Sequence, residues 1–515
     1  MSNQELQSTA KKAGIIGFSA FIGSIAGFFL QLLVAYYFGA TGSTDAFFMA
    51  QSTSELLGKL LMGGSITAVF IPLFVHRLTQ KDATGAWDLG MNIVNIMALA
   101  YVLLILVIWM FAAPFVHIIA PGFSGDTYTL TVSLLKILLP SFLFLFLVEF
   151  ATSMLHSFKE FTLPALLRIV APTVSIISIL LLVRSVGIYA LAIGVVAGSV
   201  VQLGILMFGL VRRGMKYRFF INVKDPSLKS LAHLVYPFIF SVLVTQGAGI
   251  VYRILVSPLA EGSLSALKYA EKITQLITII FLNSVTLVIY PLLSEKASLD
   301  DRVGIRETIG SSMRLIVFIT LPLTLAVAIL RQDIVSFLYE RGSFSAQDAA
   351  FTSLALLYLV LGLTTTGISS ILGHAVLALQ ETRAAVAITI SSQAVAIALF
   401  LLLVPAMGFS GLALASSLVP ISAAVLYYLY LTRFVSHLSR IFFHPVYVKI
   451  IFLSVLSSVT IWRVAQFSFP PILNIVIPLT VGSLLYVGLS YALKIEEMHQ
   501  ITQIVTSKFI KQKTV

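Results

Sequence analysis

The stretch FGATGSTDAFFMAQSTSELLGKLLMGGSITAVFIPLF, residues 38–74, places three ionisable side chains, Asp45, Glu55 and Lys59, within otherwise apolar sequence. At membrane depth an ionisable group costs at least about 2.5 to 3.5 kcal/mol on insertion scales, so it normally faces a bundle interior or a water-filled cavity. Asp45 follows a turn rich in Gly, Ser and Thr and is typical of a helix cap that accepts orphan N–H groups. Glu55 and Lys59 are four residues apart, share one helix face and can pair. The stretch therefore predicts either a structural ion pair or a substrate-facing site inside a membrane bundle.

The composition predicts an all-α polytopic membrane protein. Hydrophobic residues make up 58% of the 515 residues and charged residues 10%, and the mean hydropathy is +1.01. Average soluble chains carry roughly 25% charged residues. The net charge of +12 lies mostly in short loops between apolar runs, so we expect no nucleic-acid partner. The chain has no Cys, which excludes disulfides and thiolate metal sites, and no metal spacing links His156 to His374, so we expect no bound metal.

Fourteen apolar runs are long enough to cross a bilayer. Most Lys and Arg residues lie at the two ends of the chain and on alternate loops that share their side, so both termini are predicted to be cytoplasmic. The runs are 13–38, 45–76, 87–118, 129–157, 163–183, 187–210, 231–259, 265–294, 309–339, 349–379, 384–405, 410–430, 446–467 and 472–493.

The sequence also repeats itself. GSTDAFFMA from Gly42 aligns with GSLSALKYA from Gly262, and VGIYALAIG from Val186 aligns with MGFSGLALA from Met407, both at an offset of about 220 residues. An even repeat preserves orientation, so we expect two parallel six-helix lobes around a central cavity, with the last two spans as an appendix. The predicted parts are an N-lobe (1–213), a basic cytoplasmic or interfacial linker (214–230), a C-lobe (231–434), the last two spans (435–495) and a cytoplasmic tail (496–515).

The linker alternates cations such as Lys216 and Arg218 with aromatic side chains such as Tyr217 and Phe219. This pattern is typical of a segment that lies on an anionic membrane surface.

Ionisable and polar residues in the spans outline a candidate site. If the helices that begin each repeat line a groove between the halves, their cations form a cavity suited to a phosphate or pyrophosphate group, held by charge-assisted hydrogen bonds. The structural alternative is that Glu271 and Lys272 lie near the outer interface and snorkel. The candidate residues are Lys59, Arg253 and Lys272 for the phosphate or pyrophosphate group, together with Asp45, Glu55, Glu271 and Gln275.

Enzymatic chemistry is not expected. The chain lacks a P-loop, so it is not an ATP-driven pump, and it lacks the GxSxG, HExxH and DxD patterns of membrane hydrolases and glycosyltransferases.

The chain contains FGATGSTDAFFMA and AVFIPLF within 38–74, LHSFKEFTLPALLRIVAPT at 155, EGSLSALKYAEKITQL at 261, YPLLSEKA at 290 and LRQDIVSFLYERGSFSAQD at 330. In combination these stretches resemble the MurJ (MviN) family of lipid II flippases, part of the multidrug/oligosaccharidyl-lipid/polysaccharide exporter superfamily. The resemblance implies fourteen spans in two parallel lobes, and flipping of lipid II, the undecaprenyl-diphosphate-linked peptidoglycan precursor, across the bacterial inner membrane by alternating access. It implies no cofactor beyond coupling to Na⁺, H⁺ or the membrane potential, and a monomer in the bilayer that works with the cell-wall synthesis machinery. With such a substrate, Asp45, Glu55 and Glu271 would hold the cations and form a gate, and Gln275 would hydrogen-bond sugar or peptide.

The chain departs from the family pattern at several charged positions. Lysine is a point charge that does not reproduce the bidentate fork of arginine, so the predicted cavity is less basic than that of a typical family member. The departures are Ser24 and Leu30 for two first-span arginines, Gly58 and Lys59 for a second-span Arg pair, Lys272 for an Arg, Glu271 for an Asp, Gln275 for a Glu, and Tyr252 for an acid.

Three alternatives remain open. The first is a flippase of the Wzx type for another polyprenyl-linked oligosaccharide. The second is a MATE-like cation-coupled drug antiporter, which the surplus of cations over acids in the spans disfavours. The third is a non-transporting scaffold, whose cavity would be plugged by large apolar residues such as Phe47, Phe48 and Phe281.

Overall fold

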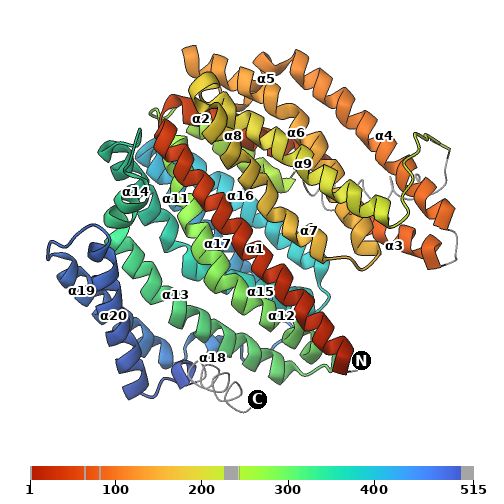
Figure 1. Cartoon of the computed structure of the whole chain (residues 1–515). Coiled ribbons are helices and arrows are strands. Elements are labelled where there is room, and N and C mark those ends of the chain that lie inside the picture. Colours follow the sequence, from red (N-terminus) through yellow and green to blue (C-terminus); the bar gives the residue numbers. More distant parts are fainter. Residues whose placement is uncertain (1–2, 63–64, 80–82, 225–241, 243, 500–515) are drawn as a thin grey trace. The chain divides into compact units, whose positions relative to one another are not determined.

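The computed structural model describes residues 3–62, 65–79, 83–224, 242 and 244–499. Helices joined by turns and loops make up this part of the chain, with no strand in it (Figure 1). The predicted all-α class is therefore confirmed. The described chain forms two compact units. Unit 1 contains the residues up to Ser265 together with Gly342–Phe344, and unit 2 contains Ala266–Arg341 and the residues from Ser345 onwards. The predicted lobe boundaries follow the sequence repeat, and they stay a prediction.

Unit 1 is built from long apolar helices joined by short turns. Between α9 and α11 the described helical residues are Val244–Val256. The helices of unit 1 are α1 (Asn3–Phe38), α2 (Gly42–Met62), α3 (Ser65–Thr79), α4 (Ala83–Met110), α5 (Ala112–Ile119), α6 (Gly125–Ser157), α7 (Thr162–Leu166), the 3₁₀ turn η1 (Leu167–Ile169), α8 (Val170–Val186) and α9 (Tyr189–Arg212).

Unit 2 takes up the chain just after the beginning of α11. Its helices are α11 (Ser263–Ile277), the π turn η2 (Thr278–Leu282), α12 (Asn283–Ser298), α13 (Arg302–Tyr339), α14 (Ala346–Leu361), α15 (Leu363–Ala378), α16 (Thr382–Met407), α17 (Phe409–Leu431), α18 (Ser439–Phe442), α19 (Val446–Ala465) and α20 (Leu473–Ala492).

Eleven helices within the described residues are long and apolar enough to cross a membrane. Three predicted spans are not among them. The span at 45–76 is divided between α2 and α3, the span at 231–259 lies partly outside the described residues, and the span at 265–294 is divided among α11, η2 and α12. The multi-pass architecture is confirmed, and the count of fourteen stays a prediction.

The backbone repeats where the sequence does. Lys159 and Gln380, which are paired by the repeat, follow α6 and α15 with φ angles of 59° and 62°. Positive φ is uncommon outside glycine, so two matching cases are informative. Gly187 and Gly408 likewise separate α8 from α9 and α16 from α17, with φ angles of 57° and 58°. The same helix ends therefore occur at equivalent positions in the two units.

The interior of unit 1 is filled with aromatic rings from α3, α4 and α6. The Phe70 and Phe150 rings lie 4.5 Å apart, and the Tyr101 ring stacks on Phe146 at 4.6 Å. These four side chains are buried, with Tyr101 fully enclosed. Close contact between flat rings leaves little free volume, so this interior is tightly packed.

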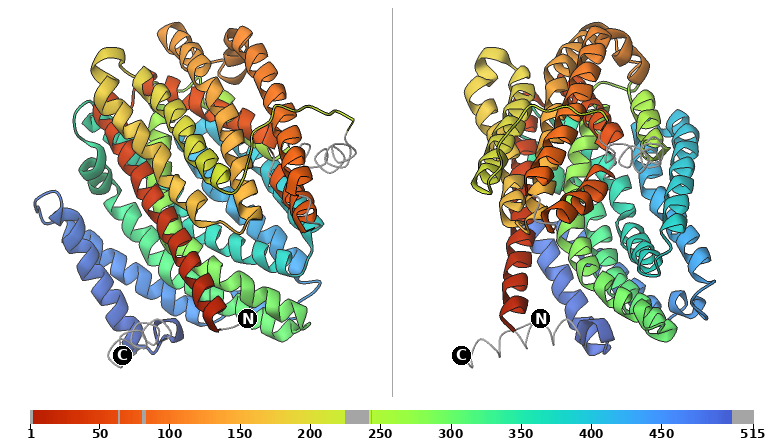
Figure 2. Two further views of the ribbon diagram at one scale, coloured as in Figure 1. Left: turned by 45° about the vertical axis from the view of Figure 1, so that its right-hand side comes forward. Right: turned by 90° about the vertical axis from the view of Figure 1, so that its right-hand side faces the viewer.

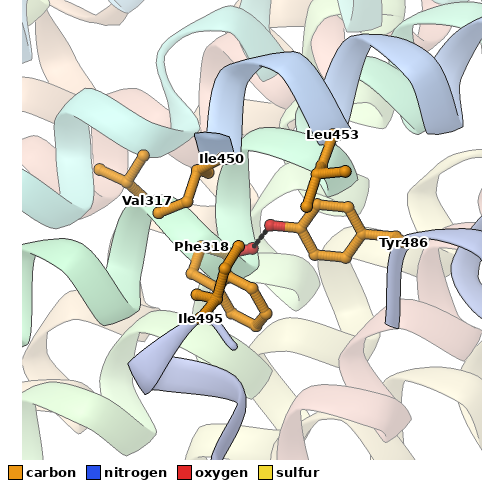
Figure 3. Packing of buried hydrophobic residues seen from close by; sticks show 6 residues of the cluster. All are labelled: Val317, Phe318, Ile450, Leu453, Tyr486 and Ile495. Carbon is orange, nitrogen blue, oxygen red and sulfur yellow. Dashed lines mark hydrogen bonds between the residues drawn. The ribbon is translucent and has the colours of Figure 1, made fainter. Parts of the chain in front are cut away.

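The last two spans pack on α13 in unit 2. Figures 1 and 2 show α19 and α20 side by side, and α19 also contacts α13. A cluster of buried side chains joins the three helices, and the Tyr486 hydroxyl donates a hydrogen bond to the carbonyl oxygen of Phe318 at 2.8 Å (Figure 3). Lipid is as apolar as these side chains, so close packing and this hydrogen bond hold the appendix in place. The cluster consists of Val317, Phe318, Ile450, Leu453, Tyr486 and Ile495.

Candidate substrate site and gate

Asp45 lies in the first turn of α2 and caps the beginning of α11. One carboxylate oxygen accepts the backbone N–H of Gly262 at 2.7 Å. The other accepts the backbone N–H of Ser265 at 2.8 Å and the Ser265 hydroxyl at 2.6 Å. Asp45 is 4% exposed, and the first N–H groups of a helix have no partner within that helix. Asp45 is therefore a cap, as its sequence context indicates, but the helix that it caps belongs to the other repeat.

Glu261 makes the reverse contact at the beginning of α2. Its Oε1 accepts the backbone N–H of Gly42 at 2.6 Å. A Cβ on Gly42 would lie 2.7 Å from the Thr127 hydroxyl, and one on Gly262 would meet the carbonyl oxygen of Ala40. Gly262 also has a φ of +82°, a conformation that glycine adopts without strain. Each repeat thus supplies the carboxylate that caps the helix start of the other.

We call this arrangement the clasp. Thr44 contributes its hydroxyl oxygen, which lies 2.8 Å from that of Ser265. All members of the clasp belong to unit 1. They are Gly42, Thr44, Asp45, Glu261, Gly262 and Ser265.

Arg253, on the helix at Val244–Val256, forms hydrogen bonds to α2. Its Nη2 donates to the carbonyl oxygen of Ser52 at 2.7 Å, and its Nε donates to the Ser52 hydroxyl at 3.2 Å. Its Nη1 donates to the carbonyl oxygen of Gly249 at 2.7 Å. A guanidinium has five donors in a fixed fork. In this state three of those donors are used to fasten the helix to α2 and to its own preceding turn.

Glu55 is exposed on α2 and accepts a hydrogen bond from the Gln51 amide at 3.2 Å. The backbone of Lys59 lies in α2, and its side chain lies outside the described part of the chain. The predicted Glu55–Lys59 pair therefore stays a prediction.

The remaining candidate residues lie together on α11. Lys272 Nζ donates to the amide oxygen of Gln275 at 3.2 Å. Glu271 pairs with Lys268 at 2.7 Å, both side chains being partly exposed. The π turn at Thr278–Leu282 follows directly. Because π turns inside α-helices often mark functional positions, the polar part of α11 stays a candidate for substrate contact.

The three phenylalanines that could fill a cavity differ in their burial. Phe47 and Phe48 are buried within unit 1, with their ring centroids 5.6 Å apart. Phe281 lies half-buried in the π turn. The two α2 residues thus belong to the packed interior of unit 1.

In unit 1, two of the predicted site residues form hydrogen bonds with serines that the sequence analysis does not name. Asp45 meets its own repeat partner, Ser265, and Arg253 meets Ser52. Neither serine was singled out from sequence, nor was Glu261. The alignment of GSTDA with GSLSA contains the missing signal, because it places Asp45 and Ser265 at the same position of the repeat.

The described part of the chain has eleven candidate spans, a repeated helical unit, and ionisable side chains on α2 and α11. These features define a multi-pass membrane protein of the duplicated-transporter class. The chain belongs to the lipid II flippase MurJ family, since the model of that family matches residues 34–481. The resemblance noted from the sequence is therefore confirmed.

Similar proteins support the same family. A "Probable lipid II flippase MurJ" of Rickettsia prowazekii is 25% identical over 430 residues, which cover 82% of this chain and 84% of that protein. A "Lipid II flippase MurJ" of Burkholderia cenocepacia is 26% identical over 404 residues, covering 76% and 78%.

Solved structures show the same fold. One described as "Lipid II flippase MurJ, inward closed conformation" superposes with a TM-score of 0.81 at 25% identity, covering 93% of this chain and 98% of that chain. An inward-facing multidrug resistance MATE family transporter of the MOP superfamily superposes with a TM-score of 0.65 at 14% identity, covering 83% and 96%. The second likeness concerns the fold alone.

Proposed function

We propose that this protein is a flippase that moves lipid II across the bacterial cytoplasmic membrane by alternating access. The observation that carries the proposal is the family match over residues 34–481, together with a TM-score of 0.81 to a structure described as a lipid II flippase. We propose that both termini are cytoplasmic, following the distribution of Lys and Arg. With no P-loop in the chain, transport would be coupled to Na⁺, H⁺ or the membrane potential.

The clasp would serve as the outer gate. On the proposed orientation, α1 ends and α2 begins at the external face, so the clasp lies at that end of the molecule. A hydrogen bond to a charged group contributes about 1.5 to 3 kcal/mol, and Asp45 accepts three such bonds. Opening outward would break these bonds and free the beginning of α11 from α2.

The diphosphate of the substrate would be held by Arg253, Lys272 and Lys59. Arg253 now donates to Ser52 and Gly249, so diphosphate binding would exchange these contacts for phosphate oxygens. The exchange would release the helix at Val244–Val256 from α2. Substrate binding and movement of this helix would thereby be linked through one side chain.

The neighbouring polar residues would complete the site. Gln275 would hydrogen-bond sugar or peptide, and Glu271 would hold Lys268 in place. Glu55 would hold Lys59. The three cations Lys59, Arg253 and Lys272 favour a diphosphate over the cationic drugs expected of an antiporter.

Complementation tests the proposal. The chain is expressed in bacteria depleted of their own lipid II flippase, beside Arg253→Gln and Lys272→Gln variants. A matched control is Lys216→Gln, which removes an exposed cation from the basic linker. We expect survival with the wild-type chain and the control, and loss of survival with the two site variants. Failure of the wild-type chain, with its membrane expression verified, would contradict the proposal and favour a different polyprenyl-linked glycan.

A further inference from the structure

A cavity of about 370 Å³ lies within unit 2 among residues of α15, α16 and α17. Ligand pockets typically enclose roughly 300–1,000 Å³, so this one has room for a small group such as a single sugar ring. Its wall combines apolar surface with hydroxyl, amide and imidazole groups. The polar and small lining residues include Ser370, His374, Thr389, Gln393, Ala423 and Tyr427.

Three polar groups in this wall are available to a ligand. His374 Nδ1 lies 2.6 Å from the carbonyl oxygen of Ser370, and a carbonyl only accepts, so Nδ1 carries the proton and Nε2 is left as an acceptor. Within the described residues, His374 Nε2, the Gln393 amide and the Tyr427 hydroxyl have no hydrogen-bond partner. They come from three different helices. Together they offer one acceptor and two groups that both donate and accept.

The lining hydroxyls add further acceptors. Thr389 donates to the carbonyl oxygen of Ala385 at 2.9 Å, and Ser392 donates to that of Ile388 at 2.8 Å. With their protons used in this way, both oxygens can only accept from a ligand. The lining residues, all of which are described, include no Asp, Glu, Lys or Arg. The cavity therefore matches a neutral group rich in hydroxyls better than it matches an ion.

Comparison of the two repeats shows which side chains differ at the positions that line the cavity. The register that pairs Gly187 with Gly408 also pairs three residues of unit 1 with three lining residues of the cavity. In unit 1 these positions carry two opposite charges within electrostatic reach of each other, and a Gln whose amide donates to the carbonyl oxygen of Leu167 at 2.8 Å. In unit 2 they carry small side chains. The pairs are Glu149 with Ser370, Arg168 with Thr389, and Gln202 with Ala423.

A glycine also shapes the wall. A Cβ on Gly373 would come within 3.3 Å of the Tyr427 ring, so the glycine lets this ring lie close against α15. The ring forms a flat apolar surface beside the free Tyr427 hydroxyl. A sugar ring, with C–H groups on its faces and hydroxyls at its edge, has the complementary distribution of polar and apolar surface.

We propose that this cavity binds one neutral sugar ring of the lipid-linked substrate. The inference rests on the proposed flippase function, which it extends by giving the sugar a subsite of its own on α15, α16 and α17. On the proposed orientation, His374 and Tyr427 lie in the last turns of helices that end at the cytoplasmic face. The subsite is then placed to take the sugar from the side where loading begins.

Thiol labelling tests the subsite directly, because the native chain has no Cys. Thr389→Cys places one thiol in the cavity wall, and Ser298→Cys, at the exposed last residue of α12, is the matched control. Each full-length variant in lipid nanodiscs is labelled with a small neutral alkylating reagent. Labelling is repeated with lipid II, with undecaprenyl diphosphate, which has no sugar, and with free N-acetylglucosamine.

The expected result is protection of the cavity thiol by lipid II and by N-acetylglucosamine, but not by undecaprenyl diphosphate. At ten times the dissociation constant roughly a tenth of the sites stay open, so labelling should slow about tenfold. The Ser298→Cys rate should not change. Lipid II binding without protection of Thr389→Cys would overturn the subsite and leave the flippase function standing. Absence of any lipid II binding would overturn the function itself, while protection by free N-acetylglucosamine would still support the subsite.

A second variant separates the subsite from a general change of shape. Gln393→Leu removes one free amide while keeping a similar volume. We expect the affinity for lipid II to fall about fivefold, since a neutral hydrogen bond contributes about that factor, and the affinity for undecaprenyl diphosphate to stay unchanged. Equal losses for the two ligands would show that the cavity does not distinguish the sugar and would overturn the inference.

Discussion

The interiors of the two units differ although their backbones repeat. Phe146 in α6 and Gly367 in α15 occupy the same position of the repeat. In unit 1 the phenylalanine ring stacks on Tyr101 at 4.6 Å. In unit 2 the glycine lets α15 approach Ile316 so closely that a Cβ would lie 2.6 Å from that side chain, and the same helix borders a partly open cavity with apolar and polar groups in its wall. Duplication thus preserved helix ends and turns, while equivalent positions diverged into part of an aromatic cluster in unit 1 and part of a cavity wall in unit 2.

This difference indicates that the aromatic cluster of unit 1 and the cavity of unit 2 have different roles. The close-packed aromatic cluster of unit 1 transmits displacement instead of absorbing it. A cavity with polar groups in its wall can take up part of a ligand. We therefore expect truncations in unit 1 to reduce stability and changes in the unit 2 cavity to reduce substrate affinity.

The largest effect is expected from Phe146→Ala. The side chain is 1% exposed, and truncating a buried Phe costs about 3 to 5 kcal/mol. The comparison variant in unit 2 is Ser370→Ala, which lies one turn from the repeat equivalent of Phe146 and removes only a hydroxyl beside the cavity. Thermal unfolding in nanodiscs should show a large fall in Tm for Phe146→Ala and a small change for Ser370→Ala. Similar falls for both variants would refute the contrast between the two interiors.

Asp45→Asn should have the next largest effect. The neutral amide has one acceptor oxygen in place of two, so one donor of Gly262 or Ser265 faces an N–H group, and the charge-assisted bonds, each about 1.5 to 3 kcal/mol, are weakened. We expect impaired transport with little loss of expression. The matched variant is Glu261→Gln, whose side chain is more exposed and makes one bond of the clasp, and it should be milder. Unimpaired transport by Asp45→Asn would show that the clasp is not a gate.

A larger side chain in the unit 2 cavity should lower the affinity for lipid II more than it lowers the stability of the protein. Ala423→Leu adds apolar volume at the position where unit 1 has Gln202. Adding methylenes to a well-packed core costs typically about 1 to 3 kcal/mol. Because the cavity has space, we expect a loss of Tm below that range and a several-fold loss of lipid II affinity. A large fall in Tm with unchanged affinity would mean that the site is ordinary packed interior.

The smallest effect is expected outside both interiors, at the beginning of α13. Asp301 accepts the backbone N–H of Gly304 at 2.8 Å and pairs with Lys296 at 3.1 Å. These bonds lower the pKa of the Asp301 carboxyl below its ordinary value of 3.8. A lowered pKa in the folded state gives stability that is present above the unfolded value and is lost as the pH falls through the folded value.

Asp301→Asn should therefore lower Tm slightly at pH 7, and the gap to the wild type should shrink as the pH falls below 3.8. Asp300→Asn, which alters a more exposed pair with Arg302, serves as the control and should have no measurable effect. A gap that is independent of pH would mean that the Asp301 charge does not contribute.

Sequence reasoning could predict the membrane class, the repeat and the chemistry of single residues. Asp45 was expected to cap a helix because of the turn before it, and it does. Its partner could not be read from the pattern, because periodicity tells which residues share a helix face and not which helix ends meet. The same limit applied to Arg253 and Ser52, which are far apart along the chain.

The cavity in unit 2 could not be predicted from the sequence. In the sequence His374 has no metal-ligand spacing to His156 and carries no further signal, and Gln393 and Tyr427 are ordinary polar residues in apolar runs. A cavity depends on the volumes of side chains on several helices, and no single run contains that information. The nearest signal was the exchange of Glu149 and Arg168 for Ser370 and Thr389 between the repeats.

The central claim is that this chain moves lipid II, and reconstitution tests it most directly. The purified protein is placed in liposomes with fluorescent lipid II on the inner leaflet, and its arrival outside is measured with a membrane-impermeant quencher. We expect faster arrival than in protein-free liposomes, and loss of that gain in the Arg253→Gln and Lys272→Gln variants. An arrival rate equal to that of protein-free liposomes, for folded wild-type protein under an imposed Na⁺, H⁺ or electrical gradient, would contradict the claim.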